Sequence, residues 1–153
     1  PVVLMVQGEF PEIGSFGTLV RFALELERVA SLVYEELASD PSCAAGAETF
    51  RALAENHRAR VALLEETRRE KLNEAVLEPI SDIRGSDYAI DTAVPKGAGA
   101  KAAAAYAAEI EETSARFYTD TARTAKNILH GAVRIFERMA KENLSNKAKL
   151  QAL

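Results

Sequence analysis

Two distant stretches of the sequence share a pattern in which one glutamate interrupts an otherwise apolar helical face. Each stretch reads Glu, a small residue, Tyr and Ala at helical spacing. The two series are Glu27, Ala30, Tyr34 and Ala38, and Glu111, Ser114, Tyr118 and Ala122. A buried carboxylate without a partner is costly. The fold must therefore bring partners to Glu27 and Glu111, and this requirement limits what the chain can form.

Length and composition indicate a single helical domain. The chain has 153 residues, 48% of them hydrophobic, which is enough for one substantial core. Ala, Leu, Glu and Arg are abundant, and all four are strong helix formers. We therefore expect an all-α fold over residues 1–153. The net charge of −4, with both signs interspersed, argues against nucleic acid or an anionic membrane as the main partner.

Cysteine usage and hydropathy suggest a cytoplasmic location. Cys43 is the single cysteine, which excludes an internal disulfide and a cysteine-cluster metal site and fits a reducing compartment. The opening PVVLMVQGEF is short and carries no basic residue, so we do not interpret it as a signal peptide. No later run is long enough to span a membrane.

Apolar periodicity and turn residues divide the chain into four helices. We expect an irregular arm at residues 1–14 and helices at about residues 15–39, 44–78, 98–124 and 127–150. The one long connection, residues 80–97, contains Gly85, Pro95 and Gly97 as helix breakers. Short, long and short connections predict a four-helix bundle made of two helical hairpins joined by one crossover.

The two halves also look like a duplicated helical pair. Glu111 follows Glu27 by 84 residues, and Phe136 follows Phe50 by 86. This register places four polar residues at one depth on the four inward faces, with two more one helical turn further on. The first four are Glu27, His57, Glu111 and Asn143, and the other two are Arg60 and Asn146.

At these residues the chain resembles the ferritin-like superfamily, specifically its rubrerythrin-like members. The resemblance rests on ExxAxxxY at Glu27, its near-copy at Glu111, and FRALAExxxxxxxLLEE beginning at Phe50. It implies a ferritin-like bundle. In that family, two helices each contribute one Glu and the other two each contribute Glu-x-x-His, and together these residues hold two iron ions.

The sequence departs from the family pattern at most of the ligand positions. Glu27 and Glu111 match the two single glutamates. The expected Glu-x-x-His pairs are replaced by His57 with Arg60 and by Asn143 with Asn146. A rival register uses Glu55 with Arg58 and Glu142 with Ser145, and it also lacks both histidines. Because a two-iron centre needs several carboxylates, we expect the ancestral iron chemistry to be lost.

Three arrangements of the polar residues can be considered. In the first, Arg60, with or without a protonated His57, pairs with Glu27 and Glu111, and the asparagines complete the hydrogen bonds. In the second, Glu27, His57, Glu111 and a water hold one iron, manganese or zinc ion. In the third, an intact two-iron site supports oxidase or peroxidase activity. Arg60 and the asparagines favour the first, in which there is no cofactor.

Other chemically notable residues have simpler interpretations. Tyr34 and Tyr118 are expected in the core with one hydrogen bond each rather than as redox-active groups. His130 is expected on a solvated face of the fourth helix. Cys43, at a helix start that favours a thiolate, has no base nearby in the sequence and is not expected to be a nucleophile.

The sequence therefore predicts a non-catalytic structural or interaction protein that forms a homodimer or higher homo-oligomer. The candidate contact surfaces are the outer end of the second helix and the alanine-rich start of the third. The alternative is a metal-binding protein with oxidase or peroxide-related redox activity, using Glu27, His57 and Glu111 as ligands.

Overall fold

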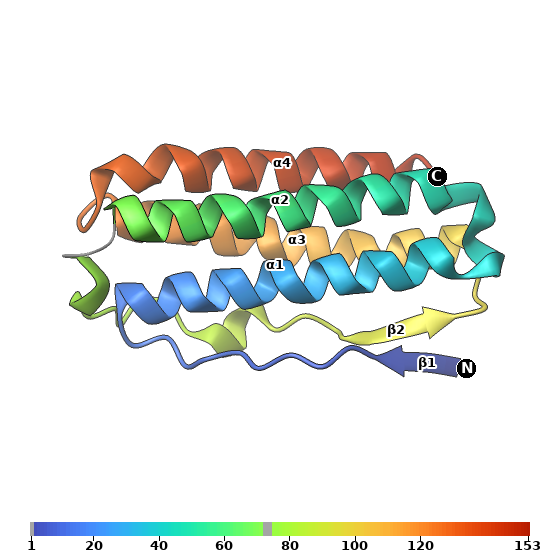
Figure 1. Cartoon of the computed structure of the whole chain (residues 1–153), viewed down its shortest axis with the longest axis horizontal. Helices are drawn as coiled ribbons and strands as arrows, with labels where there is room; N and C mark the ends of the chain where they lie inside the picture. Colours follow the sequence, from blue (N-terminus) through green and yellow to red (C-terminus); the bar gives the residue numbers. More distant parts are fainter. Residues whose placement is uncertain (1, 72–74) are drawn as a thin grey trace.

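Four long helices lie side by side in a computed structural model of the chain (Figure 1), which describes residues 2–71 and 75–153. The helices are α1 (Phe16–Ser39), α2 (Ala47–Lys71), α3 (Ala100–Ala125) and α4 (Val133–Gln151). Helix α1 packs mainly against α2, and α3 mainly against α4. The four predicted helices and their grouping into two hairpins with a long crossover are confirmed. None of the helices in the described ranges is long and apolar enough to cross a membrane.

The described residues also form four short 3₁₀ elements, which are η1 (Pro41–Gly46), η2 (Ala75–Leu77), η3 (Gly85–Tyr88) and η4 (His130–Ala132). Three of them, η1, η2 and η4, change the predicted helix boundaries. Helix α2 begins at residue 47 rather than 44 because Asp40 caps η1, its carboxylate accepting the N–H of Ser42 at 3.0 Å. Helix α4 begins at residue 133 rather than 127 because the backbone at Leu129 is not helical.

The predicted end of the second helix, at residue 78, is wrong in part. Residues 75–77 form the turn η2, and the backbone after it is extended enough for Pro79 to bridge to Ser15. The part of that prediction that falls on residues 72–74 lies outside the described residues.

A small sheet lies outside the helices and was missed by the all-α prediction. Strand β1 (Val2–Met5) pairs antiparallel with β2 (Ala93–Lys96), with Val3 opposite Pro95 and Leu4 opposite Val94. The arm of residues 1–14 is therefore partly a strand rather than irregular. Its partner comes from the crossover, 90 residues further along the chain, so no local pattern identified the pair.

The crossover and the arm run along the helices together (Figure 1) and are tied to the start of α1. The N–H of Phe16 donates to the carbonyl of Glu78 at 2.8 Å, and that of Ile80 donates to Gly14 at 3.1 Å. Gly17 lies directly against Val76, since a Cβ at residue 17 would come within 2.4 Å of the Val76 Cγ2 and 2.9 Å of its carbonyl oxygen.

Buried apolar residues form two clusters, one towards each end of the helices. One cluster includes Phe16, Phe117 and Phe136, and the other includes Val33 and Phe50. Between the clusters, all four long helices contribute buried polar side chains, which form the candidate site described below.

The close contact at Gly17 makes a testable prediction. We expect Gly17→Ala to lower the free energy of unfolding by about 1–3 kcal/mol, because the added methyl group overpacks the contact with Val76. Gly14→Ala is the matched control, since nothing lies within 4 Å of a Cβ at that position. Urea unfolding of both variants measures the difference, and equal stability would contradict the close approach.

Candidate functional site

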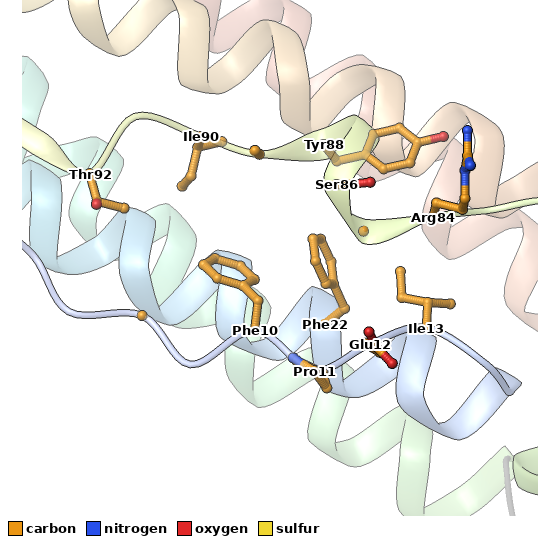
Figure 2. A pocket seen from close by; sticks show the side chains of 13 residues that line it. Phe10, Pro11, Glu12, Ile13, Phe22, Arg84, Ser86, Tyr88, Ile90 and Thr92 are labelled. Atoms are coloured by element: carbon orange, nitrogen blue, oxygen red, sulfur yellow. The ribbon is translucent and has the colours of Figure 1, made fainter.

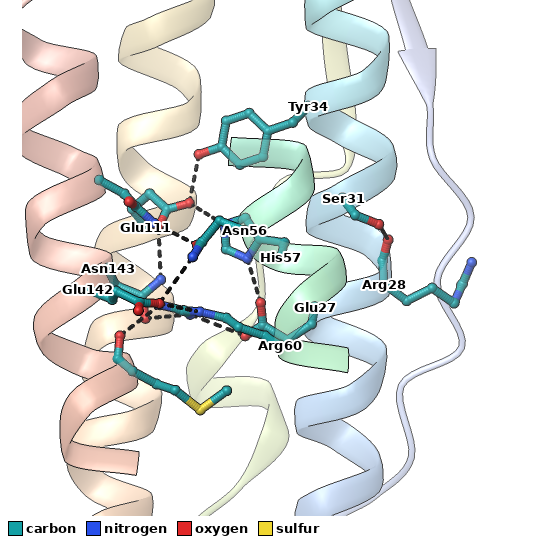
Figure 3. A network of polar contacts seen from close by, with 12 residues as sticks. Glu27, Arg28, Ser31, Tyr34, Asn56, His57, Arg60, Glu111, Glu142 and Asn143 are labelled. Carbon is teal, nitrogen blue, oxygen red and sulfur yellow. Dashed lines mark hydrogen bonds and ion pairs between the residues drawn. The ribbon is translucent and has the colours of Figure 1, made fainter. Parts of the chain in front are cut away.

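The structure brings the six predicted polar residues together in one buried layer across the bundle. Figure 3 labels all of them except Asn146. We call this set the charge layer. Its members come from all four long helices, and none is more than 4% exposed. They are Glu27 on α1, His57 and Arg60 on α2, Glu111 on α3, and Asn143 and Asn146 on α4.

His57 lies between the two buried glutamates and contacts both. Its Nδ1 is 2.5 Å from Oε1 of Glu27, and its Nε2 is 2.7 Å from Oε2 of Glu111. Only the protonated imidazolium carries an N–H on both nitrogens, so the geometry fits a charged ring. Burial lowers the pKa of His57, but the two carboxylates outweigh this effect and raise its pKa to about 9.

Arg60 supplies the second positive charge of the layer. Its Nη1 donates to Oδ1 of Asn143 at 3.0 Å and lies 3.4 Å from Oε2 of Glu27. Its Nη2 donates to the Met139 carbonyl at 2.9 Å and to Oε1 of Glu142 at 3.0 Å. The guanidinium therefore joins α2 to α4 and reaches the α1 carboxylate.

The two tyrosines of the repeated pattern contact the two glutamates reciprocally. Tyr34 on α1 donates to Oε2 of Glu111 on α3 at 2.6 Å, and Tyr118 on α3 donates to Oε2 of Glu27 on α1. Burial, together with the nearby carboxylates, raises the pKa of Tyr34 and of Tyr118 well above the ordinary value. Both phenols are therefore neutral donors at physiological pH.

Asparagines complete the shell around Glu111. The Nδ2 of Asn143 donates to Oε1 of Glu111 at 2.8 Å, and that of Asn146 donates to the same oxygen at 3.1 Å. Asn146 also donates to Oδ1 of Asn56 at 3.1 Å, and Asn56 donates to Glu142 at 3.1 Å. The sequence analysis missed Asn56, although its position directly before His57 could have indicated a place near the layer.

The glutamates stay ionised in spite of their burial. Burial raises the pKa of Glu27, but His57 and Arg60 outweigh it, and the pKa lies below its ordinary value. For Glu111, burial is likewise outweighed, first by the charge of His57, and its pKa falls to about 2. Two carboxylates and two cations thus share the layer, and their formal charges cancel.

Several contacts of one half have a counterpart in the other half. Arg60 of the first half donates to Glu142 of the second, and its equivalent Asn146 of the second half donates to Asn56 of the first. The rings of Tyr34 and Phe50 stack with centroids 6.4 Å apart, and those of Tyr118 and Phe136 stack 6.2 Å apart. Neutral asparagines therefore occupy in α4 the positions that His57 and Arg60 occupy in α2.

The residues present do not fit a two-metal centre. Both oxygens of Glu27 and both of Glu111 already accept hydrogen bonds, and Arg60 places a positive charge where a cation would have to sit. Among the described residues, no group of three or more His, Cys, Asp or Glu is arranged to hold a metal ion. Within the described part of the chain, the buried hydroxyls of Ser114 and Thr121 have no hydrogen-bond partner. Neutral hydroxyls do not replace the missing carboxylate ligands.

The structure does not support the rival register, because it places the Glu55 and Arg58 pair on the surface instead of in the layer. Arg58 forms exposed ion pairs with Glu35 and Glu55. Only Glu142 of that register reaches the layer, at its half-exposed edge, through Arg60.

His130 and Cys43 lie away from the charge layer. His130 is exposed, but it belongs to the turn η4 rather than to a face of α4. Cys43 is buried in η1, and burial raises the pKa of its thiol, so the expected preference for a thiolate at this helix start is wrong.

A separate pocket lies between the arm and the crossover (Figure 2) and shares no residue with the charge layer. Its volume is about 620 Å³. The rings of Phe10 and Phe22, with centroids 4.9 Å apart, form one wall, and Tyr88 and Ile90 lie opposite. The pocket could hold a small apolar molecule.

Comparisons of the chain with protein-family models, with curated proteins and with solved structures found no match. The fold and the site together define a mostly helical protein of four long helices with a small two-stranded sheet and a buried, charge-balanced polar layer.

The paired charges predict a large effect of removing Arg60. We expect Arg60→Ala to lower the free energy of unfolding by about 3–5 kcal/mol, because it leaves buried carboxylate charge uncompensated. Arg58→Ala, which removes only exposed ion pairs, should cost about 0–1 kcal/mol. Urea unfolding measures both values. If Arg60→Ala matched the parent protein, Arg60 would not stabilise the layer.

The pKa values of the layer predict how stability depends on pH. The raised pKa of His57 contributes stability that is complete below about pH 6.5 and is lost as the pH rises through about 9. The lowered pKa of Glu111 contributes stability that is complete above about pH 4.5 and is lost as the pH falls towards about 2. The free energy of unfolding should therefore be highest between about pH 4.5 and 6.5.

Urea unfolding across the pH range, with His57→Gln as the control, measures this dependence. The variant should lack the loss of stability between about pH 6.5 and 9 that the parent shows. An NMR titration of the His57 ring gives its pKa directly in the folded parent protein. A ring that loses its proton near the ordinary value of 6.5 would contradict the ion-paired imidazolium.

Proposed function

We propose that this chain is a ferritin-like, rubrerythrin-related bundle that has lost its di-iron centre and acts as a non-catalytic structural or interaction protein. The observation that carries the proposal is the position of His57, whose two ring nitrogens each contact one of the two buried glutamates. The residues at the positions that bind metal in the rubrerythrin-like family instead form hydrogen bonds and ion pairs with one another.

Electrostatics supports this assignment. A metal ion bound between Glu27 and Glu111 would replace an arrangement in which two buried anions already face two cations. Adding a divalent ion would leave excess positive charge in a region whose side chains are at most 4% exposed, so that water screens it little, unless His57 lost its proton and Arg60 moved out. Both changes would break hydrogen bonds that join different helices.

A single-metal site at Glu27, His57 and Glu111 is the competing function. A metal-binding histidine must be neutral at the ligating nitrogen, so His57 would have to give up at least one of its two carboxylate contacts. Because its pKa is about 9, this exchange would cost free energy at neutral pH.

We also propose that the protein works as a homo-oligomer. Within the described residues, the surfaces suggested by the sequence offer little apolar area, since α3 begins with small alanines and Leu77 is the large exposed apolar residue beyond α2. Exposed apolar side chains gather instead on β1. A non-catalytic protein acts through its surface, and exposed apolar patches commonly mark contact sites. We therefore expect a partner to bind at this patch.

Metal analysis tests the loss of the di-iron centre. We expect protein purified without chelator to contain no stoichiometric iron, manganese or zinc, and its melting temperature to be unchanged by added Fe²⁺, Mn²⁺ or Zn²⁺. A metal that binds the native state would raise that temperature by mass action. Visible absorption after addition of iron tests separately for an oxo-bridged centre.

The matched control is the double variant Glu27→Gln and Glu111→Gln, which keeps the side-chain shapes and removes both buried anions, and circular dichroism checks that it stays folded. Metal bound equally by parent and variant is attached elsewhere on the surface and leaves the proposal standing. Stoichiometric metal that is present in the parent and absent from the variant would overturn the proposal and establish the metal-binding function.

A further inference from the structure

The two edges of the small sheet differ in their capacity to accept another strand. Val6 N–H donates to the Thr92 carbonyl at 3.0 Å, directly beyond the pair formed by Met5 and Ala93. Hydrogen-bonded and non-hydrogen-bonded pairs alternate along an antiparallel ladder. The pairs formed by Val3 with Pro95 and by Met5 with Ala93 are therefore non-hydrogen-bonded, and their backbone groups point to the outer edges.

The outer edge of β2 is closed to strand pairing. Pro95 has no N–H to offer there, and the N–H of Ala93 already donates to Oδ1 of Asp91 at 2.8 Å. Lys96 is held by Glu36 of α1 at 3.2 Å. Proline and lysine are the residues with which proteins commonly block sheet edges.

The outer edge of β1 carries none of these blocking residues. The N–H and carbonyl groups of Val3 and Met5 face outwards there, and no side chain in the described ranges caps either amide. All four residues of the strand are apolar and exposed, on both faces of the sheet, from 39% for Leu4 to 71% for Val2. Strand β2 contacts α1, and β1 lies on its far side (Figure 1).

We propose that β1 pairs antiparallel with β1 of a second copy of this chain, which joins the two small sheets into one four-stranded sheet. The inference rests on the proposed homo-oligomer and identifies its contact. A strand without charge and with the same outward groups at residues 3 and 5 is complementary to itself about a twofold axis. No charged side chain on β1 opposes the approach of a second copy.

The outward groups determine the register of this pairing. Val3 of one copy lies opposite Met5 of the other, so each outward N–H finds a carbonyl, and Leu4 faces Leu4 of the second copy on the axis. Directly opposed residues of a non-hydrogen-bonded pair have Cα atoms about 4.5 Å apart, within the range that a disulfide spans.

Leu4→Cys tests the register by crosslinking. We expect Leu4→Cys to form a disulfide-linked dimer under mild oxidation at least about tenfold faster than Leu144→Cys, because the paired strands hold the two thiols together. Leu144 is the matched control, since it is an equally apolar leucine, 51% exposed, on α4. Cys43 is fully buried and does not compete.

Leu4→Lys tests the same contact without oxidation. It places two like charges on the axis and should raise the dissociation constant of the dimer at least about tenfold in analytical ultracentrifugation. Leu144→Lys should leave the dissociation constant unchanged. Circular dichroism melting of each variant checks that the helices stay folded.

The outcomes distinguish the inference from the homo-oligomer on which it rests. Fast crosslinking of Leu4→Cys together with weakening by Leu4→Lys supports the pairing of β1. A dimeric parent protein in which Leu4 and Leu144 variants behave alike overturns the β1 contact and leaves the homo-oligomer in place. A parent protein that stays monomeric over the whole concentration range overturns both.

Discussion

The structure depends on an imidazolium held between two buried carboxylates. His57 reaches Glu27 on one side and Glu111 on the other, so one side chain from α2 connects the two glutamate-bearing helices, α1 and α3. Arg60 extends the same network to α4. Neither glutamate could remain buried and ionised without these cations, and neither cation could be buried without the glutamates. These contacts therefore fix the four helices in a single relative register.

This interdependence explains why the two halves of the bundle are not equivalent. Both halves keep the glutamate and the tyrosine, which makes the Tyr34–Glu111 and Tyr118–Glu27 contacts reciprocal. The second helix of each half differs, because α2 carries the cations and α4 carries neutral asparagines. Cations in both halves would leave the layer with excess positive charge, whereas one cationic half balances the two glutamates.

The features that could bind a ligand or a second copy lie outside the charge-balanced interior of the bundle. The arm and the crossover, which lie along the helices, line most of the aromatic pocket and carry the open edge of β1. The helices form a scaffold, and the segments laid against them carry the surfaces that can meet a ligand or a second copy. Functional residues are commonly carried by connecting segments that a rigid scaffold positions.

The sequence by itself determined the four helices, their pairing and the residues of the charge layer. Both the apolar periodicity and the 84-residue repeat are spacings that can be counted along the sequence. The sequence also left three arrangements of those residues open. Only the tertiary structure decided that both nitrogens of His57 face carboxylates, since the choice depends on angles between helices that spacing does not encode. The sheet was decided in the same way, because Val3 and Pro95 lie far apart in the sequence, with α1 and α2 between them, and no local pattern links the two strands.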